Sequence, residues 1–225
     1  MRTLQIRNFN EDINLDDYTL IELVIQNKKI FYKYCEYCYN DFPASSCYFN
    51  YKVDSKTLDS DKYIHFISHP YCLDLNTKKN INGLYKILKK KYYIDLEEDI
   101  NILKNKAKEI VSNISLDFDI ELSLADDIPV DDLFKIMNLK FNDYESMSLM
   151  EQFIKYIKII YEIQGISVFI IPFLYSYFEE NEINEIKKEL AYSRIALITL
   201  ENTRKEINNV ADKCLLFDLD LCSIE

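Results

Sequence analysis

Residues 151–201, EQFIKYIKIIYEIQGISVFIIPFLYSYFEENEINEIKKELAYSRIALITLE, decide the fold. The stretch begins with apolar side chains that recur at the 3.6-residue period and share one face, which predicts an amphipathic helix. These residues are Phe153, Ile154, Ile157, Ile160 and Tyr161. Gly165 follows, and because glycine tolerates the positive φ of a helix C-terminus, the helix is predicted to stop there.

A βαβ unit is predicted in the rest of this stretch. Ile166 to Ile171 is a short run of mostly β-branched and aromatic residues that Pro172 ends, which is typical of a buried strand. A helix is predicted over 179–191 and a second buried strand over 194–201. Two strands joined through a helix by short connections pair in parallel, so the rest of the chain must supply further strands and covering helices.

The N-terminal part of the chain supplies strands, which are predicted over residues 4–9, 19–26, 48–53 and 63–67. A helix over 28–39 follows the second strand, and Asn27 can cap it. This strand–turn–helix position is where a P-loop protein binds phosphate. Phosphate-binding loops need several glycines, whereas this turn has none and the chain has only Gly83 and Gly165. The sequence therefore argues against a working P-loop or Rossmann nucleotide site.

The middle of the chain is predicted to be helical. Helices are predicted over 76–91, 96–112 and 130–137, a short strand over 139–141, and a final strand over 214–219. The fold class is therefore α/β, with a mainly parallel sheet that is split in sequence. Residues 1–70 and 140–225 supply its two halves, and residues 71–139 form a helical excursion between them.

Composition limits the class of function. The chain has 225 residues, 48% of them hydrophobic, and a net charge of −11, which argues against a protein that coats nucleic acid but leaves room for a local basic surface. No apolar run approaches the roughly 20 residues of a membrane span, and the N-terminus lacks the apolar core of a signal peptide. Six cysteines without a scaffold pattern predict free thiols and a cytoplasmic protein.

Lysines are concentrated in the helical excursion. They are Lys78, Lys79, Lys86, Lys89, Lys90, Lys91, Lys104, Lys106 and Lys108. Lys86 with Lys90, and Lys104 with Lys108, are i,i+4 pairs, and such a stripe on an acidic protein can follow a phosphate backbone. The alternative is an ordinary solvated helix face, which the residues alone favour.

Carboxylates dominate the next segment, and no lysine or arginine lies between residues 109 and 134. The acids are Asp117, Asp119, Glu121, Asp126, Asp127, Asp131 and Asp132. A cation with oxygen ligands would relieve their repulsion, and calcium suits an irregular loop site. The alternative is a charged loop with acids at the start of the helix at Val130, where they interact favourably with the helix dipole. The residues alone leave both interpretations open.

No catalytic set is present in the sequence. Cys35, Cys38 and Cys47 could suggest zinc, but a structural site needs four ligands, so buried structural cysteine is the better interpretation. His65 and His69 are four residues apart, yet the pattern around them is that of a strand, where this spacing does not bring side chains together. The sequence predicts a protein that is not an enzyme.

The layout of the chain resembles the Csn-two family, the small adaptation proteins of type II-A CRISPR systems. The matching segments are Ser167–Ile171, Ile195–Leu200, Glu201–Arg204, Phe217–Asp218, Leu20–Ile25, Tyr34–Cys35, Cys38–Tyr39 and Ile128–Phe141. The resemblance covers nearly the whole length but is diffuse and has no sharp signature. One departure concerns the acidic junction, where Glu121 and Leu122 fit the family pattern but Ser123 and Ala125 occupy two of its acidic positions.

The resemblance implies an α/β head derived from P-loop proteins but lacking the nucleotide loop, with a helical leg inserted into it. It further implies a homotetrameric ring whose basic hole takes the ends of double-stranded DNA, with calcium near the junction of head and leg. The adaptation integrase and the type II effector nuclease would be its partners. The residues assigned on this basis are Lys86, Lys90, Lys104 and Lys108 for DNA, and Asp119, Glu121, Asp126 and Asp127 for calcium.

Two functions from different classes therefore remain. The first is a non-enzymatic ring that binds DNA ends during spacer acquisition, independently of base sequence and with steep salt dependence. The second is an acidic protein-interaction module whose P-loop-like head is free of nucleotide. Binding of linear against closed circular duplex separates the two.

Overall fold

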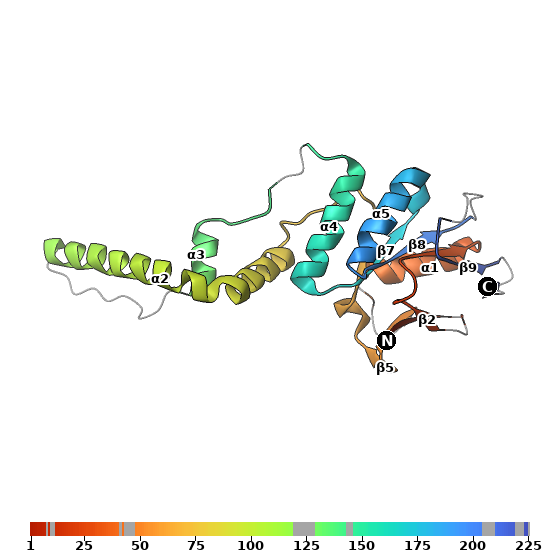
Figure 1. Ribbon diagram of the computed structural model, residues 1–225, viewed down its shortest axis with the longest axis horizontal. Coiled ribbons are helices and arrows are strands. Elements are labelled where there is room, and N and C mark those ends of the chain that lie inside the picture. The colour runs from red at the N-terminus through yellow and green to blue at the C-terminus, as the bar shows by residue number, and fades with distance from the viewer. Residues whose placement is uncertain are drawn as a thin grey trace. The chain divides into compact units, whose positions relative to one another are not determined.

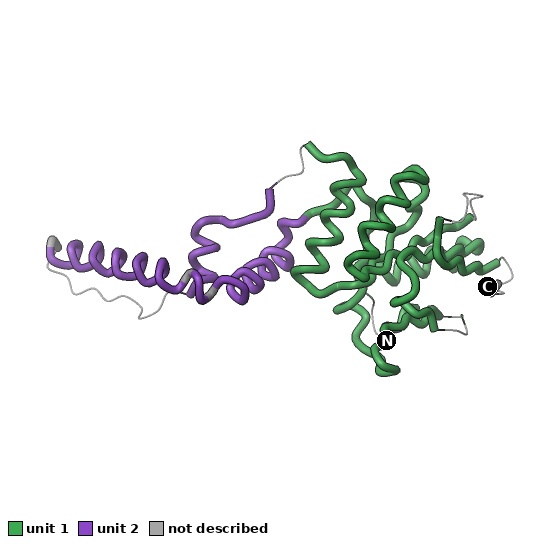
Figure 2. Tube along the Cα trace, viewed as in Figure 1, with its two compact units in different colours: residues 1–74, 144–225 green, residues 75–143 purple. Residues whose placement is uncertain are grey.

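The computed structural model describes residues 1–7, 9, 12–40, 42, 48–118, 129–142, 146–203, 210–218 and 223–224. The chain divides into two compact units, which Figure 2 distinguishes by colour. Unit 1 consists of residues 1–74 and 144–225, and unit 2 consists of residues 75–143. Unit 1 is therefore built from two segments that are distant in sequence.

A six-stranded sheet forms the centre of unit 1, in the order β10-β9-β3-β8-β7-β6. Its strands are β3 (Leu20–Ile25), β6 (Ile64–Phe66), β7 (Val168–Pro172), β8 (Ala196–Glu201), β9 (Lys213–Phe217) and β10 (Ser223–Ile224). The five strands from β9 to β6 pair in parallel, and β10 adds an antiparallel edge. The predicted α/β class and mainly parallel sheet are confirmed.

The predicted βαβ unit is present. Helix α4 (Leu149–Gln164) ends at Gly165, whose φ of 74° gives the left-handed C-cap expected from the sequence. Strands β7 and β8 pair in parallel on either side of α5 (Glu180–Tyr192) in the sequence. Both strands are buried along their whole length, which explains why they are apolar without alternation.

A second, antiparallel sheet lies in unit 1, in the order β2-β1-β4-β5. Its strands are β1 (Arg2–Ile6), β2 (Asp12–Asn14), β4 (Phe49–Val53) and β5 (Lys56–Leu58). The prediction placed the strands over 4–9 and 48–53 in the single split sheet, which was wrong. Period-two alternation indicates which residues share a face of a strand, but it does not identify the neighbouring strand.

The core of unit 1 lies on both faces of the parallel sheet. Helix α1 (Lys28–Tyr39) and the antiparallel sheet pack on one face, where large side chains such as Tyr34, Phe49 and Leu23 form one cluster. Helices α4 and α5 pack side by side on the other face (Figure 1). Alternate strand residues therefore point into two different apolar layers. The described part of the unit also contains two short 3-10 helices, η2 (Ser60–Lys62) and η3 (Leu174–Ser176).

Unit 2 is built on α2 (Lys78–Phe118), a single helix of 41 residues, with α3 (Val130–Ile136) beside it. The prediction of two helices, over 76–91 and 96–112, was wrong. Residues 92–95 contain neither glycine nor proline, so nothing in the backbone chemistry ends the helix between them.

The strand predicted over 139–141 is also absent, since these described residues are irregular. The backbone N–H of Phe141 donates to Asn76 Oδ1 at 2.9 Å, and Asn76 Nδ2 donates to the Phe141 carbonyl at 3.1 Å. A side-chain amide therefore satisfies the backbone groups that a neighbouring strand would otherwise bind.

Candidate nucleic-acid interface

Helix α2 carries the lysines that the sequence singled out. It begins after Thr77, whose Oγ1 accepts a hydrogen bond from the Asn80 backbone N–H at 3.3 Å, as an N-cap residue does. From there to Phe118 the only strong helix breaker is Gly83. The four lysines assigned to DNA therefore lie on one continuous helix.

The four lysines fall close to one side of this helix. Lys86, Lys90, Lys104 and Lys108 are separated by 4, 14 and 4 residues, so at 3.6 residues per turn they lie within an arc of about 40°. Lys104 is half-buried, and Lys86, Lys90 and Lys108 are exposed. We call this set the lysine stripe. The assignment from sequence omitted Lys79, which is exposed and lies seven residues before Lys86 on the same side.

Most of the lysine stripe is not neutralised by nearby carboxylates. Within the described ranges, Lys86, Lys90 and Lys108 have no acidic side chain at ion-pair distance. Lys106, by contrast, lies 2.7 Å from Glu109. Positive charges held on one side without carboxylate partners favour contact with a polyanion.

Another side of α2 is occupied by α3. The Tyr85 hydroxyl donates to the backbone carbonyls of Phe134 and Leu139 at 3.3 and 3.1 Å, and the Tyr85 and Phe134 rings lie 5.5 Å apart. One turn further, Lys89 Nζ lies 3.5 Å from Asp131. These contacts hold α3 on α2, and they explain why Lys89 binds α3 rather than belonging to the lysine stripe.

The residues assigned to calcium, Asp119, Glu121, Asp126 and Asp127, lie outside the described residues. The two acids that follow them are described: Asp131 faces Lys89, and Asp132 accepts from Lys135 at 2.8 Å. Both lie in the first turn of α3, where carboxylates interact favourably with the helix dipole. Among the described residues, no group of three or more potential metal ligands is present.

Of the two cysteines of α1, Cys38 is buried and Cys35 is half-buried. Burial raises the pKa of the Cys35 thiol to about 11 and holds that of Cys38 well above its ordinary value. Both thiols therefore stay protonated at neutral pH, which suits packing rather than metal binding. Cys47, the third residue of the zinc interpretation, lies outside the described residues.

The turn after β3 is a helix cap. The Asn27 side chain accepts hydrogen bonds from the backbone N–H groups of Lys29 and Ile30, at 3.1 and 3.3 Å. The predicted cap is confirmed. Because the side chain already occupies these N–H groups, they are not available to a phosphate.

A polar cluster that the sequence did not predict lies in the parallel sheet. Glu22 and Thr199 are partners across β3 and β8, and both are buried. Thr199 Oγ1 donates to Glu201 Oε1 at 2.7 Å, and it accepts from the Leu174 backbone N–H at 3.2 Å. Burial, and then the charges of the two glutamates, raise the pKa of Tyr175. The only sequence signal was a glutamate inside an apolar strand.

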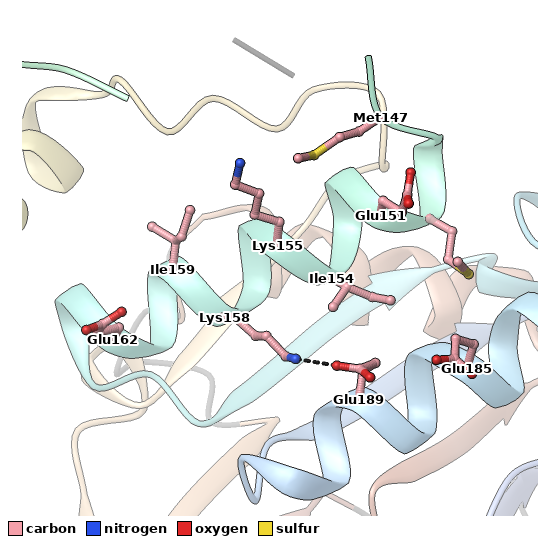
Figure 3. A pocket seen from close by; sticks show the side chains of 10 residues that line it. Met147, Glu151, Ile154, Lys155, Lys158, Ile159, Glu162, Glu185 and Glu189 are labelled. Atoms are coloured by element: carbon pink, nitrogen blue, oxygen red, sulfur yellow. Dashed lines mark hydrogen bonds and ion pairs between the residues drawn. The ribbon is translucent and has the colours of Figure 1, made fainter. Parts of the chain in front are cut away.

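A cavity of 540 Å³ lies along α4 and α5 (Figure 3). Its lining combines apolar side chains with acids and two lysines: Met147, Met150, Glu151, Ile154, Lys155, Lys158, Ile159, Glu162, Glu185 and Glu189. Lys158 reaches across to Glu189 on α5, with Nζ 2.5 Å from the carboxylate. The cavity is open, and charged residues make up more than half of its lining, whereas small-molecule sites are lined mostly by apolar side chains.

Comparison with known proteins matches this chain to a protein family and to solved structures. A family model described as CRISPR-associated protein (Cas_Csn2) matches residues 42–221. No curated protein matches. Among solved structures, the chain is similar to the one titled "Crystal structure of Stu0660 of Streptococcus thermophilus", with a TM-score of 0.54 and 12% identity over 94% of this chain and 73% of that chain. At this identity the likeness shows the fold. Among the described residues, no helix has the length and apolarity needed to span a bilayer.

Proposed function

The chain belongs to the CRISPR-associated Cas_Csn2 family, and on this premise we propose that it is a non-enzymatic, homotetrameric ring that binds the ends of double-stranded DNA during spacer acquisition. The proposed binding is independent of base sequence. Its proposed partners in adaptation are the integrase and the type II effector nuclease. The observation that carries the proposal is the lysine stripe on α2.

The lysine stripe explains how an acidic chain can bind DNA. Net charge is −11, so a single subunit would repel a duplex at long range. In a ring, four copies of each lysine surround one duplex. Salt at physiological concentration screens exposed charges beyond about 8 Å, so lysines in contact with phosphates dominate over more distant acids. Contacts of this kind read the backbone and not the bases.

The proposed absence of catalysis rests on the chemistry of the described polar groups. The turn after β3 is closed by Asn27, and the Thr199–Glu201 hydrogen bond is buried within the sheet. Neither arrangement pairs an accessible nucleophile with a base. We propose that the P-loop-like position has become a structural part of the fold.

Calcium is proposed to bind Asp119, Glu121, Asp126 and Asp127. Carboxylate oxygens are the ligands that calcium prefers, and this short segment offers several. Bound there, calcium would neutralise acids that follow directly on the lysine-bearing helix. This would reduce repulsion between the segment and a duplex held by the lysine stripe.

The second candidate is an acidic protein-interaction module, which the cavity along α4 and α5 favours. Its methionines, Met147 and Met150, are flexible and adapt to different partners. Four glutamates against two lysines would select a basic partner.

Binding of linear and relaxed circular duplexes of equal length tests the proposal. Linear DNA should bind, and the closed circle should not, because a duplex enters a ring through an end. Alanine at all four stripe lysines should abolish binding. A matched control replaces four lysines of unit 1, Lys28, Lys29, Lys33 and Lys56, which are exposed, and should bind nearly as wild type. Equal binding of both DNA forms would reject entry of a DNA end into the ring, and unchanged binding by the stripe variant would reject the lysine stripe as the DNA-binding surface.

A further inference from the structure

The cavity along α4 and α5 is lined almost entirely by these two helices (Figure 3). Nine of its ten lining residues belong to α4 or α5, and the tenth, Met147, comes just before α4. From Met150 to Glu162 the lining follows α4 for a length of about 18 Å, at 1.5 Å per residue. The cavity is therefore long enough to contact three turns of another helix.

An apolar strip runs along the cavity. Met150 and Ile154 are four residues apart on α4, so they share one side of the helix, and both are half-buried. We call these two residues the apolar strip. Met147 and Ile159 add further apolar atoms to the lining. Apolar side chains that stay partly exposed in an open cavity are available to the apolar side chains of a partner.

The rest of the lining is charged, and its acids outnumber its bases. Four glutamates and two lysines give it a net charge of −2. Lys158 binds Glu189, and without this neutral pair three glutamates remain against Lys155. Glu185 lies 3.9 Å from Lys188, a distance at which a partly exposed pair contributes little. An acidic lining of this kind attracts a cationic partner.

We propose that the cavity binds a positively charged amphipathic helix of another protein. The apolar side chains of that helix cover the apolar strip, and its lysines or arginines face Glu185 and Glu162. Apolar side chains three to four residues apart on the bound helix match the spacing of Met150 and Ile154. An extended peptide would need a strand edge for its backbone, whereas the backbone groups of α4 and α5 are already used within these helices.

The inference rests on the second candidate function, which it deepens by naming the kind of partner. It is independent of DNA binding. Helices α4 and α5 belong to unit 1, whereas the lysine stripe lies in unit 2. A basic helix and a duplex carry opposite charges, so they do not compete for the same side chains.

Fluorescence anisotropy with a labelled synthetic peptide tests the inference. The probe is an amphipathic peptide of about 14 residues, four helical turns, with leucines on one side and lysines elsewhere. Its control is a peptide of the same composition whose order has no helical period. The full chain should bind the amphipathic peptide about tenfold more tightly. Because a net charge of −11 attracts both peptides alike, this difference reports the apolar contact.

Two variants place the binding in the cavity. Met150→Glu should weaken peptide binding about tenfold, because it puts a charge in the apolar strip. Attraction by charge alone predicts the opposite, since this variant is more acidic than wild type. Glu185→Lys should also weaken binding. Glu36→Lys is its matched control, because it makes the same change of net charge on the exposed side of α1 and should bind as wild type.

Several results would overturn the inference. Equal binding of the two peptides would mean that charge alone attracts them, and unchanged binding by Met150→Glu would exclude the cavity. If saturating peptide changed the number of subunits measured by light scattering, a second copy of the chain would occupy the cavity instead. Binding of linear DNA is measured on the same samples. Normal DNA binding without peptide binding would reject this inference alone, and peptide binding without DNA binding would reject the DNA proposal alone.

Discussion

The His65 ring nitrogen Nε2 lies 3.0 Å from the Tyr156 hydroxyl, which joins the edge strand β6 to helix α4. These residues are 91 positions apart and come from the two separate segments of unit 1. The Tyr156 ring is buried, and burial followed by the nearby charge of Asp74 raises the pKa of its hydroxyl to about 12. The contact therefore helps to hold the two segments together.

Tyr156→Phe should lower the free energy of unfolding by about 1 kcal/mol, the usual net value of one hydrogen bond. It should also change the response to alkali. In the folded protein the pKa of the Tyr156 hydroxyl is about 12, above its ordinary value of 10.0. The protonated hydroxyl therefore contributes its full stabilisation of the folded state below pH 10, and this contribution is lost as the pH rises toward 12. Urea unfolding at about pH 8, 10 and 11 should show a shallower alkaline loss in the variant. If the free energy of unfolding fell as steeply with pH in the variant as in the wild type, the Tyr156 hydroxyl would not have this role.

Glu201→Gln should leave the protein as stable as wild type at neutral pH, or more stable. The side chain is 1% exposed, and glutamine keeps an oxygen that can accept from Thr199 while removing a buried charge. Glu201→Leu is the contrasting variant and should cost about 1–3 kcal/mol, because it leaves the Thr199 hydroxyl without this acceptor. Thermal unfolding of both variants shows which of them is less stable. If Glu201→Gln lost more stability than Glu201→Leu, the charge of Glu201 itself would stabilise the sheet.

Single substitutions in the lysine stripe should change the salt dependence of DNA binding. Lys86→Ala or Lys108→Ala should weaken binding equally for unrelated sequences and reduce the log–log salt slope by about 0.9 for each phosphate that the protein no longer neutralises. Four subunits can multiply this effect. Fluorescence anisotropy with two unrelated duplexes at several salt concentrations measures it, with Lys56→Ala as control. Weakening confined to one sequence would indicate that the lysines bind bases instead.

Asp126→Asn with Asp127→Asn should lower thermal stability in calcium and hardly change it in chelator. Calcium would stabilise the folded state by mass action, and the variant removes two of its four proposed ligands. Asp132→Asn is the control, because its carboxylate pairs with Lys135 and its small effect should be the same in both conditions. If the double variant lost the same thermal stability in calcium and in chelator, Asp126 and Asp127 would instead act only at the start of the helix that begins at Val130.

Ile94→Pro should disrupt α2, whereas Ile94→Ala should not. The side chain is 83% exposed, so the difference between the two variants reports the backbone. Proline inside a helix costs about 3 kcal/mol relative to alanine. Circular dichroism should show loss of helix only in the proline variant. Equal helicity of the two would mean that the chain tolerates a break between residues 91 and 96.

The sequence correctly predicted the elements that begin or end at a residue with a strong boundary preference, such as glycine, proline or a capping asparagine. Gly165 and Pro172 bound the apolar run that became β7, and Asn27 marks the start of α1. The continuity of α2 was missed, because two helices were predicted, with the first ending at residue 91 and the second beginning at residue 96. No residue there forbids a helix, and the helix continues through it.

Contacts between distant residues could not be predicted. The stripe spacing of Lys86 and Lys90 is visible in the sequence, but the pairing of Lys89 with Asp131 depends on how α3 packs. The separate antiparallel sheet was missed for the same reason, since β1 and β4 are joined by 42 intervening residues that carry no pairing signal.

The central position of β3 has a consequence for synthesis of the chain. Its neighbours β8 and β9 come much later in the sequence, so after Ile25 is added about 176 further residues must follow before the end of β8 exists. At roughly 5–20 residues per second this takes about 9–35 seconds. During that time LIELVI is an unpaired strand, and Glu22 is its only charge. A charge inside an apolar segment disfavours its aggregation, so we expect Glu22→Leu to increase aggregation of the chain during synthesis, even though the Glu22 carboxylate is costly to bury in the finished sheet.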